Sequence, residues 1–163
     1  MFYNQNAQNH ETEGRKLFRE LITQFEVKEY SFTKDEFNPI DIAFKHKGFN
    51  VIADIKVRNR EAANFSTTFL EVQKCKAMRQ IKREEGHDIM WYVNFFGDDL
   101  VYIYNIDKHW KDKITPLYTW RTHDYSHGKV MKYFFESPVK EALVYRKIDG
   151  VWKKRDSYIN HGA

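Results

Sequence analysis

The chain has 163 residues, which suits one compact domain with a sizeable core, and its 42% hydrophobic and 31% charged residues exclude a disordered chain. Its net charge of +4 is uneven, because residues 1–105 hold 15 Lys and Arg against 16 Asp and Glu, whereas residues 106–163 hold 12 against 7. A single cysteine, Cys75, excludes an internal disulfide and a cysteine-rich zinc cluster, and no apolar run approaches the roughly 18 residues of a membrane span.

The N-terminal part predicts a helix followed by three strands. Residues 1–10 are polar and predict a frayed tail, and from Glu11 the pattern becomes helical, with Thr12 as the expected N-cap. The apolar stripe of this helix comprises Leu17, Phe18, Leu21, Ile22 and Phe25. The three strands are expected over residues 27–32, 40–44 and 49–57. The last two strands are separated by a short turn and should form an antiparallel hairpin.

The middle of the chain predicts a second helix and a second hairpin. Residues 58–65 predict a loop, and a helix follows over residues 69–85. Three residues can cap this helix, namely Ser66, Thr67 and Thr68, and Gly86 ends it. Strands are expected over residues 89–96 and 100–106, on either side of a turn at Gly97-Asp98-Asp99.

The C-terminal third leaves two alternatives open. Residues 117–122 and 130–135 predict strands. Beyond them, either a helix begins at Ser137-Pro138, or residues 139–147 form a strand that pairs with residues 151–154. The order of elements predicts an α/β fold, in which a mixed sheet is flanked by helices. We expect a single domain over 1–163, with a core at about 11–106 and an aromatic and basic C-terminal extension at 107–163.

Two carboxylates and a lysine interrupt the apolar strands of the first hairpin. Asp41 lies in the second strand, and Asp54 and Lys56 lie in the third. A carboxylate among β-branched residues is costly unless it is paired, exposed or bound to a cation. Asp54 and Lys56 point to the same face of their strand, because side chains alternate, and Asp41 can reach that face across an antiparallel hairpin. The pattern predicts that the three side chains converge.

This set suits a magnesium ion beside a phosphate. Asp41, Asp54 and the backbone carbonyl of Ile55 offer the hard oxygen ligands that Mg²⁺ prefers. The metal can stabilise developing charge on the phosphate and make water more acidic, and Lys56 can hold the attacking water and offset phosphate charge. The competing interpretation is a surface salt bridge between Lys56 and one of the aspartates, because so short a motif often occurs without function.

The ordered combination of Pro39-Ile40-Asp41 and Asp54-Ile55-Lys56 resembles the PD-(D/E)XK nuclease superfamily, although Ile40 separates the proline from the first aspartate. Within the superfamily, residues 11–106 are most similar to archaeal-type Holliday junction resolvases and related phage nucleases. The resemblance implies a restriction-endonuclease-like mixed sheet with flanking helices. It also implies cleavage of DNA phosphodiester bonds that depends on Mg²⁺, with Mn²⁺ as a substitute metal.

The resemblance implies two further catalytic residues. Those nucleases carry a glutamate in the first helix and a glutamine on the helix after the lysine strand, and Glu13 and Gln73 match these places. Glu13 would support the metal, and Gln73 would orient the lysine or a phosphate. Glu11 and Glu20 compete with Glu13 for this role. Glutamates near a helix N-terminus and glutamines on a helix surface are also common without any function.

Basic residues predict contacts with DNA phosphates. Arg58 and Arg60 directly follow the strand that carries Lys56, and Lys74 opens a basic series on the second expected helix. In the C-terminal third, basic residues interleave with aromatic ones such as Trp152. That suits backbone contact and base stacking, or equally an amphipathic element that covers the sheet. The selected DNA contacts are Arg58, Arg60, Lys74, Lys153, Lys154 and Arg155.

The histidines predict no metal site. His123 and His127 have the i, i+4 spacing that suits a metal on a helix, but their segment predicts a loop. His109 and His161 show no partner pattern.

The first hypothesis for the function is a Mg²⁺-dependent endonuclease of DNA repair or recombination, with a Holliday junction resolvase as the leading subtype. We expect a homodimer that acts on branched or duplex DNA, since a four-way junction has two equivalent scissile strands. We also expect no membrane association and a cytoplasmic location, in the host cytoplasm for a phage protein, because the polar N-terminus lacks a secretory signal. The alternative hypothesis is a non-catalytic DNA-binding or assembly module that retains the nuclease fold.

Overall fold

The computed structural model describes residues 5–35, 38–59, 61–62, 66–120 and 128–155, with residues 5–10 and 120 described by their backbone alone. The chain forms two helices, α1 (Gln5–Gln24) and α2 (Val72–Glu85), and two short 3₁₀ turns, η2 (Ile106–Lys108) and η4 (Val139–Glu141). The strands are β1 (Tyr30–Phe32), β2 (Ile42–His46), β3 (Phe49–Arg58), β4 (Thr67–Glu71), β5 (Ile89–Phe96), β6 (Leu100–Asn105), β7 (Lys113–Trp120), β8 (Lys129–Pro138), β9 (Leu143–Ile148) and β10 (Val151–Arg155).

The strands form a large sheet and a small one. The large sheet has seven strands in the order β1-β2-β3-β5-β6-β9-β10, and the small sheet has three strands in the order β4-β8-β7. Strands β3 and β5 run parallel, whereas the other neighbouring strands of both sheets run antiparallel. The predicted α/β class and mixed sheet are therefore confirmed.

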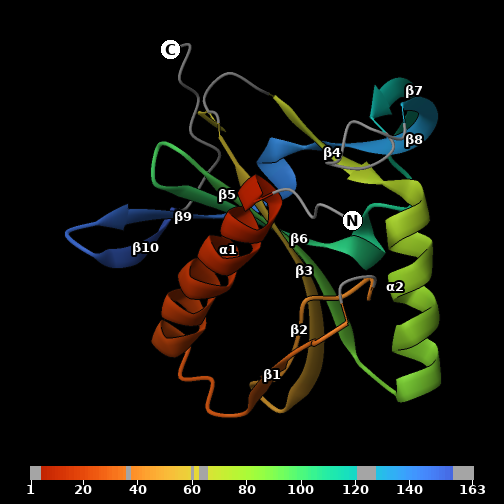
Figure 1. Ribbon diagram of the computed structural model, residues 1–163. Coiled ribbons are helices and arrows are strands. Elements are labelled where there is room, and N and C mark those ends of the chain that lie inside the picture. Colours follow the sequence, from red (N-terminus) through yellow and green to blue (C-terminus); the bar gives the residue numbers. More distant parts are fainter. Residues whose placement is uncertain (1–4, 36–37, 60, 63–65, 121–127, 156–163) are drawn as a thin grey trace.

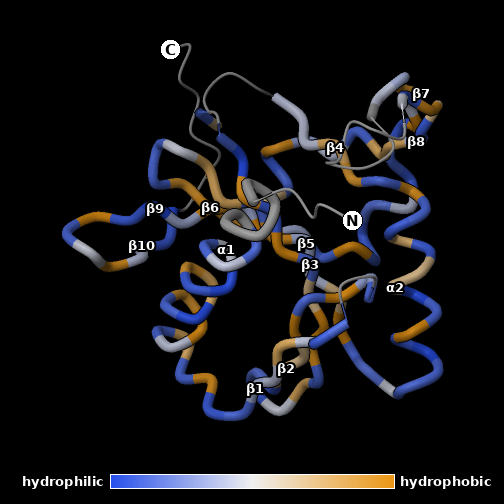
Figure 2. The backbone as a smooth tube through the Cα atoms, in the orientation of Figure 1, coloured by the Kyte–Doolittle hydropathy of each residue, from blue (hydrophilic) through white to orange (hydrophobic). Residues whose placement is uncertain are grey.

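The two helices cover opposite faces of the large sheet (Figure 1). The predicted apolar stripe of α1 is confirmed, since Phe18, Leu21 and Ile22 are fully buried and pack with Val51 of β3. Helix α2 packs on the other face, where Cys75 and Met78 join a second core cluster that includes Ile52 of β3. Apolar and polar residues recur in turn along both helices (Figure 2). This pattern gives each helix an apolar side that can pack on the sheet. Strand β3 lies between two cores and can present a different set of side chains to each.

The C-terminal third contributes to both sheets. Strands β9 and β10 extend the large sheet beyond β6, while β7 and β8 form the small sheet with β4. Of the two alternatives open after residue 136, the strand is correct, because β9 pairs with β10 across the Asp149-Gly150 turn. Gln24 of α1 exchanges two hydrogen bonds of 2.7 Å with the backbone of Trp152 in β10, which ties the first helix to the last strand.

The expectations about where both helices begin are wrong. Helix α1 begins at Gln5, so the expected tail is helical from that residue and Thr12 lies inside the helix. Residues 67–71 form strand β4, because they pair with β8, and α2 begins only at Val72. The expected caps therefore lie in or beside a strand, where Thr68 accepts a hydrogen bond from the hydroxyl of Tyr104. Gly86 ends α2 as expected, in the left-handed conformation with φ of 72°.

The remaining strand boundaries differ by a few residues. Strand β1 is shorter than expected, and β2 begins after Asp41. In the part of the chain that the structure describes, neither helix is long and apolar enough to cross a membrane.

Candidate active site

The predicted residues meet on the α2 side of strand β3. Asp54, Lys56 and Arg58 share this face, because side chains alternate along a strand. The parallel neighbour β5 places Tyr92 opposite Asp54 and Asn94 opposite Lys56. A row of polar and charged groups therefore crosses the centre of the sheet, at a place where neighbouring side chains form the apolar core.

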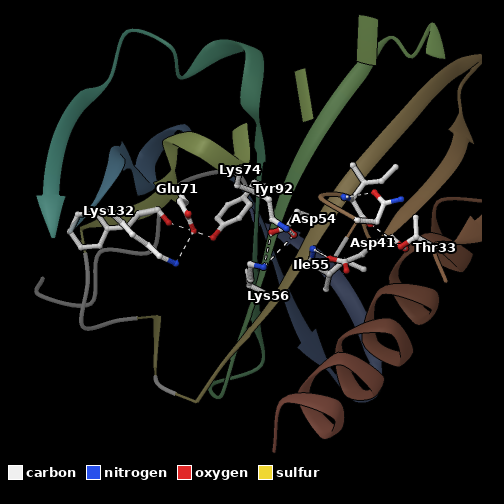
Figure 3. A network of polar contacts seen from close by, with 12 residues as sticks. Thr33, Asp41, Asp54, Ile55, Lys56, Glu71, Lys74, Tyr92 and Lys132 are labelled. Atoms are coloured by element: carbon white, nitrogen blue, oxygen red, sulfur yellow. Dashed lines mark hydrogen bonds and ion pairs between the residues drawn. The ribbon is translucent and has the colours of Figure 1, made fainter. Parts of the chain in front are cut away.

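Two lysines hold the buried carboxylate of Asp54 (Figure 3). Its side chain is 1% exposed, and the ammonium of Lys56 lies 3.1 Å from Oδ2 and 3.2 Å from Oδ1. The ammonium of Lys74, in the first turn of α2, lies 3.1 Å from Oδ1. A cation at a helix N-terminus is disfavoured by the helix dipole, so the contact with Asp54 offsets this cost. Both lysines keep part of their surface in water, at 33% and 27% exposed, and they form the solvent-accessible side of the cluster.

Asp41 is fixed at the start of β2 by bonds to its backbone and its side chain. Its N–H donates to the carbonyl of Ala53 at 2.9 Å, and its carbonyl accepts from the N–H of Thr33 at 2.9 Å. The carboxylate accepts a hydrogen bond of 2.6 Å from the N–H of Ile55. This bond brings the Asp41 carboxylate to the backbone between Asp54 and Lys56, as the hairpin pattern predicts.

The two carboxyl groups titrate in opposite directions. Burial and the neighbouring charge of Asp54 raise the pKa of Asp41 to about 6, against the hydrogen bond from Ile55. Burial also acts to raise the pKa of Asp54, but the ammonium groups of Lys56 and Lys74 outweigh it and hold that pKa below the ordinary value. Burial acts to lower the pKa of Lys56, but the Asp54 carboxylate raises it above the ordinary value. Lys56 therefore stays protonated at neutral pH.

Arg58 extends the site along β3. Its Nε donates to Oδ1 of Asn94 at 3.2 Å, and one terminal nitrogen donates to the hydroxyl of Tyr92 at 2.8 Å. Asn94 is fully buried, and its Nδ2 has no hydrogen-bond partner within the described part of the chain. Tyr92 and Asn94 are site residues that the sequence analysis missed. Their signal is a pair of polar groups at alternate positions of an otherwise apolar buried strand.

The role predicted for Lys74 changes with its position. The sequence predicts that Lys74 lies on a phosphate-binding helix surface, whereas in the structure its ammonium is paired with Asp54. Gln73, the neighbouring residue that the resemblance favours, is exposed on α2.

Glu13 lies on α1, at the opposite face of the sheet. Its side chain is exposed, while the next residue, Gly14, packs directly against β3. A Cβ at Gly14 would lie 3.1 Å from Cγ2 of Ile55 and 3.2 Å from Cγ2 of Val57, so the absence of a side chain permits this close approach. The competitors of Glu13 are engaged elsewhere, because Glu11 pairs with Arg15 at 2.9 Å and Glu20 pairs with Lys147 at 2.9 Å.

The other selected DNA contacts lie away from this cluster. Arg60 falls outside the described residues. Lys153, Lys154 and Arg155 lie on β10, the outer strand of the large sheet, four places from β3. Trp152 is 5% exposed and packs on Phe95 of β5, so it belongs to the core of the α1 side and is not a stacking platform.

The residues of the cluster fit a divalent metal ion. Asp41, directly before β2, and Asp54 of β3 supply carboxylate oxygens, and Ile55 between Asp54 and Lys56 supplies a backbone carbonyl. Burial and the neighbouring charge of Asp54 raise the pKa of Asp41, and a bound cation would relieve both costs of its ionisation. Oδ2 of Asp54 has the Lys56 ion pair but no hydrogen bond, which leaves it available as a ligand.

Comparisons with known proteins give a likeness in structure and none in sequence. No protein-family model matches the sequence, and no curated protein is significantly similar to it. Among solved structures, the chain is similar to a Holliday junction resolvase from the archaeal hyperthermophile Archaeoglobus fulgidus. The two share 12% sequence identity with a TM-score of 0.47, and the match covers 75% of this chain and 81% of that one. At this level of similarity, only the side chains of the site bear on the function.

Proposed function

We propose that this protein is a metal-dependent endonuclease of the PD-(D/E)XK type that hydrolyses DNA phosphodiester bonds. One observation carries the proposal: Asp41, directly before β2, converges with Asp54 and Lys56 of the neighbouring strand β3. Two carboxylates beside a solvent-accessible ammonium form a site for a cation and a phosphate together.

The residues of the site divide the work between them. Asp41, Asp54 and the carbonyl of Ile55 would hold Mg²⁺, or Mn²⁺ in its place. When bound, the ion supplies positive charge beside a phosphate oxygen and makes water a better nucleophile. Lys56 stays protonated, so it acts as a charge and a hydrogen-bond donor that positions water or phosphate, and does not act as a general base.

Arg58 serves as a phosphate anchor next to the reacting group. Its Nε and one terminal nitrogen are fixed by Asn94 and Tyr92, so the guanidinium is held in place before DNA arrives. A guanidinium with further donors presents a fork that matches a phosphate. The preorganised side chain loses less conformational entropy on binding than a free arginine does.

The proposed substrate is branched or duplex DNA, with a four-way junction as the leading form and a homodimer in the cytoplasm as the active species. Glu13 in the first helix and Gln73 after the lysine strand support this subtype through the family resemblance. The basic surface of β10 supports contact with a second stretch of the DNA backbone.

A cleavage assay on a panel of labelled junction, flap, duplex and single-stranded DNA tests the proposal. We expect Mg²⁺ or Mn²⁺ to support cleavage by the natural chain and no cleavage in EDTA or by Asp54→Asn. Asp149→Asn is a matched control, because Asp149 lies in an exposed turn at φ of 52°, a conformation that asparagine readily adopts. Full activity of Asp54→Asn, with Asp149→Asn also active, overturns the assignment of the site.

A second candidate is a non-catalytic DNA-binding module. The observation that favours it is the double ion pair of Asp54, since Lys56 and Lys74 already neutralise this carboxylate without a metal. Binding of junction DNA without cleavage of any substrate, in Mg²⁺ and in Mn²⁺, supports this candidate against the enzyme.

A further inference from the structure

Three side chains of metal-binding type converge outside the candidate active site. Nδ1 of His109 lies 2.7 Å from Oδ2 of Asp112 and 3.7 Å from Oε2 of Glu141. The ligand atoms of the three residues all lie within 4.8 Å of one another. His109 had no partner pattern in the sequence, because Glu141 reaches it from a segment 32 positions further along the chain.

The cluster lies where the chain passes between the two sheets. Turn η2, which ends just before His109, leads from β6 of the large sheet to β7 of the small one. Turn η4, which ends at Glu141, leads from β8 of the small sheet back to β9 of the large one. Ile106 of η2 and Val139 of η4 are both buried in the core. An ion held by this cluster would therefore join both crossovers.

The spacing and chemistry of the donors suit a transition metal. Four ligands at about 2.0–2.1 Å from a tetrahedral Zn²⁺ lie about 3.3 Å apart, and the two distances from Nδ1 of His109 fall on either side of this value. An imidazole nitrogen favours Zn²⁺ and its neighbours in the first transition row over Mg²⁺. A neutral imidazole with two carboxylates carries two negative charges, which a divalent cation neutralises.

The imidazole is already positioned for such an ion. His109 is 2% exposed, and its ring packs edge-on against Tyr104 with ring centroids 5.1 Å apart. The N–H of His109 donates to the carbonyl of Ile106, and the N–H of Asp112 donates to the carbonyl of His109. The turn that carries two of the three donors is therefore fixed by its own backbone.

We propose that His109, Asp112 and Glu141 bind one Zn²⁺ ion, with water as the fourth ligand, and that this ion fixes the small sheet against the large one. The site is structural and does not depend on the proposed nuclease activity. Its metal class differs from that of the candidate active site, which offers oxygen ligands alone.

Zinc binding to the full, tag-free chain tests this inference. The chain is equilibrated with Zn²⁺ and dialysed, and bound metal is then counted by mass spectrometry. We expect one ion per chain that is lost in Glu141→Gln and in His109→Gln but kept in Asp54→Asn and in a His123→Gln/His127→Gln control. With free Zn²⁺ at about a hundredfold above Kd, we expect Tm to rise by about 5–10 °C in the natural chain and to stay constant in Glu141→Gln.

The variants separate metal binding from a simple hydrogen-bonded cluster. His109 is buried, so His109→Gln can lower stability by itself, whereas Glu141 is 47% exposed, so we expect Glu141→Gln to keep the fold. Co²⁺ in place of Zn²⁺ should give the visible absorption of a tetrahedral site in the natural chain and lose it in Glu141→Gln. The inference is overturned if the natural chain retains no zinc, if Glu141→Gln binds it equally, or if the ion is lost in Asp54→Asn.

Discussion

The carboxylates of Asp41, directly before β2, and of Asp54, on the neighbouring strand β3, are held in opposite ways. Two ammonium groups, from Lys56 and Lys74, lie 3.1 Å from the oxygens of Asp54. The carboxylate of Asp41 accepts a hydrogen bond from the N–H of Ile55, and its pKa is raised to about 6. The same conservative substitution at the two positions should therefore change stability in opposite directions.

Asp54→Asn should destabilise the metal-free protein. The substitution removes a buried anion and leaves the ammonium groups of Lys56 and Lys74 close together without their counter-charge. We expect a loss of about 1–3 kcal/mol of unfolding free energy, reduced from the cost of a fully buried pair because both lysines are partly exposed. Urea unfolding in EDTA at pH 7.5 measures it, with Asp149→Asn as the control. A gain of stability would show that carboxylate repulsion dominates the site.

Asp41→Asn should stabilise the metal-free protein in a manner that depends on pH. Because the native pKa of Asp41 is raised to about 6, its ionisation costs native stability as the pH rises from about 4 through 6. Asparagine keeps the oxygen that accepts from Ile55 and removes this cost. We expect a gain of about 1–2 kcal/mol at pH 8 and close to none at pH 4. Thermal unfolding of the natural chain and of Asp41→Asn in EDTA between pH 4 and pH 8 measures this gain. A difference in stability that does not vary with pH contradicts the prediction.

The two lysines should separate in a kinetic assay. Lys56→Ala should lower kcat strongly, by about 100-fold or more, and change DNA affinity little, because its proposed role is at the reacting phosphate. Lys74→Ala removes one of the two counter-ions of Asp54, so its main effect should be on stability and on the metal concentration needed for half-maximal rate. Lys76→Ala, two residues further along α2 and exposed, is the control. Normal kcat at saturating DNA in Lys56→Ala would assign Lys56 to binding.

Alternation along β10 divides its basic residues between the two faces of the large sheet. Lys153 and Arg155 lie on the face that carries Asp54, as the strand registers show, whereas Lys154 shares the α1 side with Trp152. Lys153→Ala/Arg155→Ala should therefore weaken DNA binding, and each lost phosphate contact should reduce the slope of log K against log salt by about 0.9.

Lys154→Ala is the matched control for this pair and should leave the slope unchanged. Fluorescence anisotropy with labelled duplex DNA between low and high salt measures both variants. An equal effect of the control and the double variant would mean that net charge, and not the face of the sheet, governs the affinity.

Local patterns predicted the hairpin of β2 and β3, because alternation in a strand and the turn before Phe49 are short-range signals. For the same reason, these local patterns predicted that Asp41, Asp54 and Lys56 lie close together, as they do in the structure. They failed at residues 67–71, whose apolar spacing also fits a helix. This segment is a strand because it pairs with β8, more than 60 residues further along the chain, and local propensity does not contain that information.

The position of Lys74 could not be predicted for a similar reason. A basic residue at a helix start suggests an exposed surface, and only the docking of α2 on β3 shows that Lys74 meets Asp54. Tyr92 and Asn94 were missed because a buried strand with alternate polar residues also occurs in ordinary cores. Their partner, Arg58, lies 34 positions before Tyr92 and 36 before Asn94.

The hydrogen bonds between Gln24 and Trp152 have a consequence for how the protein is made. Helix α1 leaves the ribosome well before its partner strand β10, because 128 positions separate Gln24 from Trp152. Until β10 emerges, the end of α1 lacks these bonds and the ring of Trp152, and its apolar surface there stays open to other chains. We therefore expect nascent chains that stall before residue 151 to depend on chaperones, whereas chains extended through β10 should complete the sheet spontaneously.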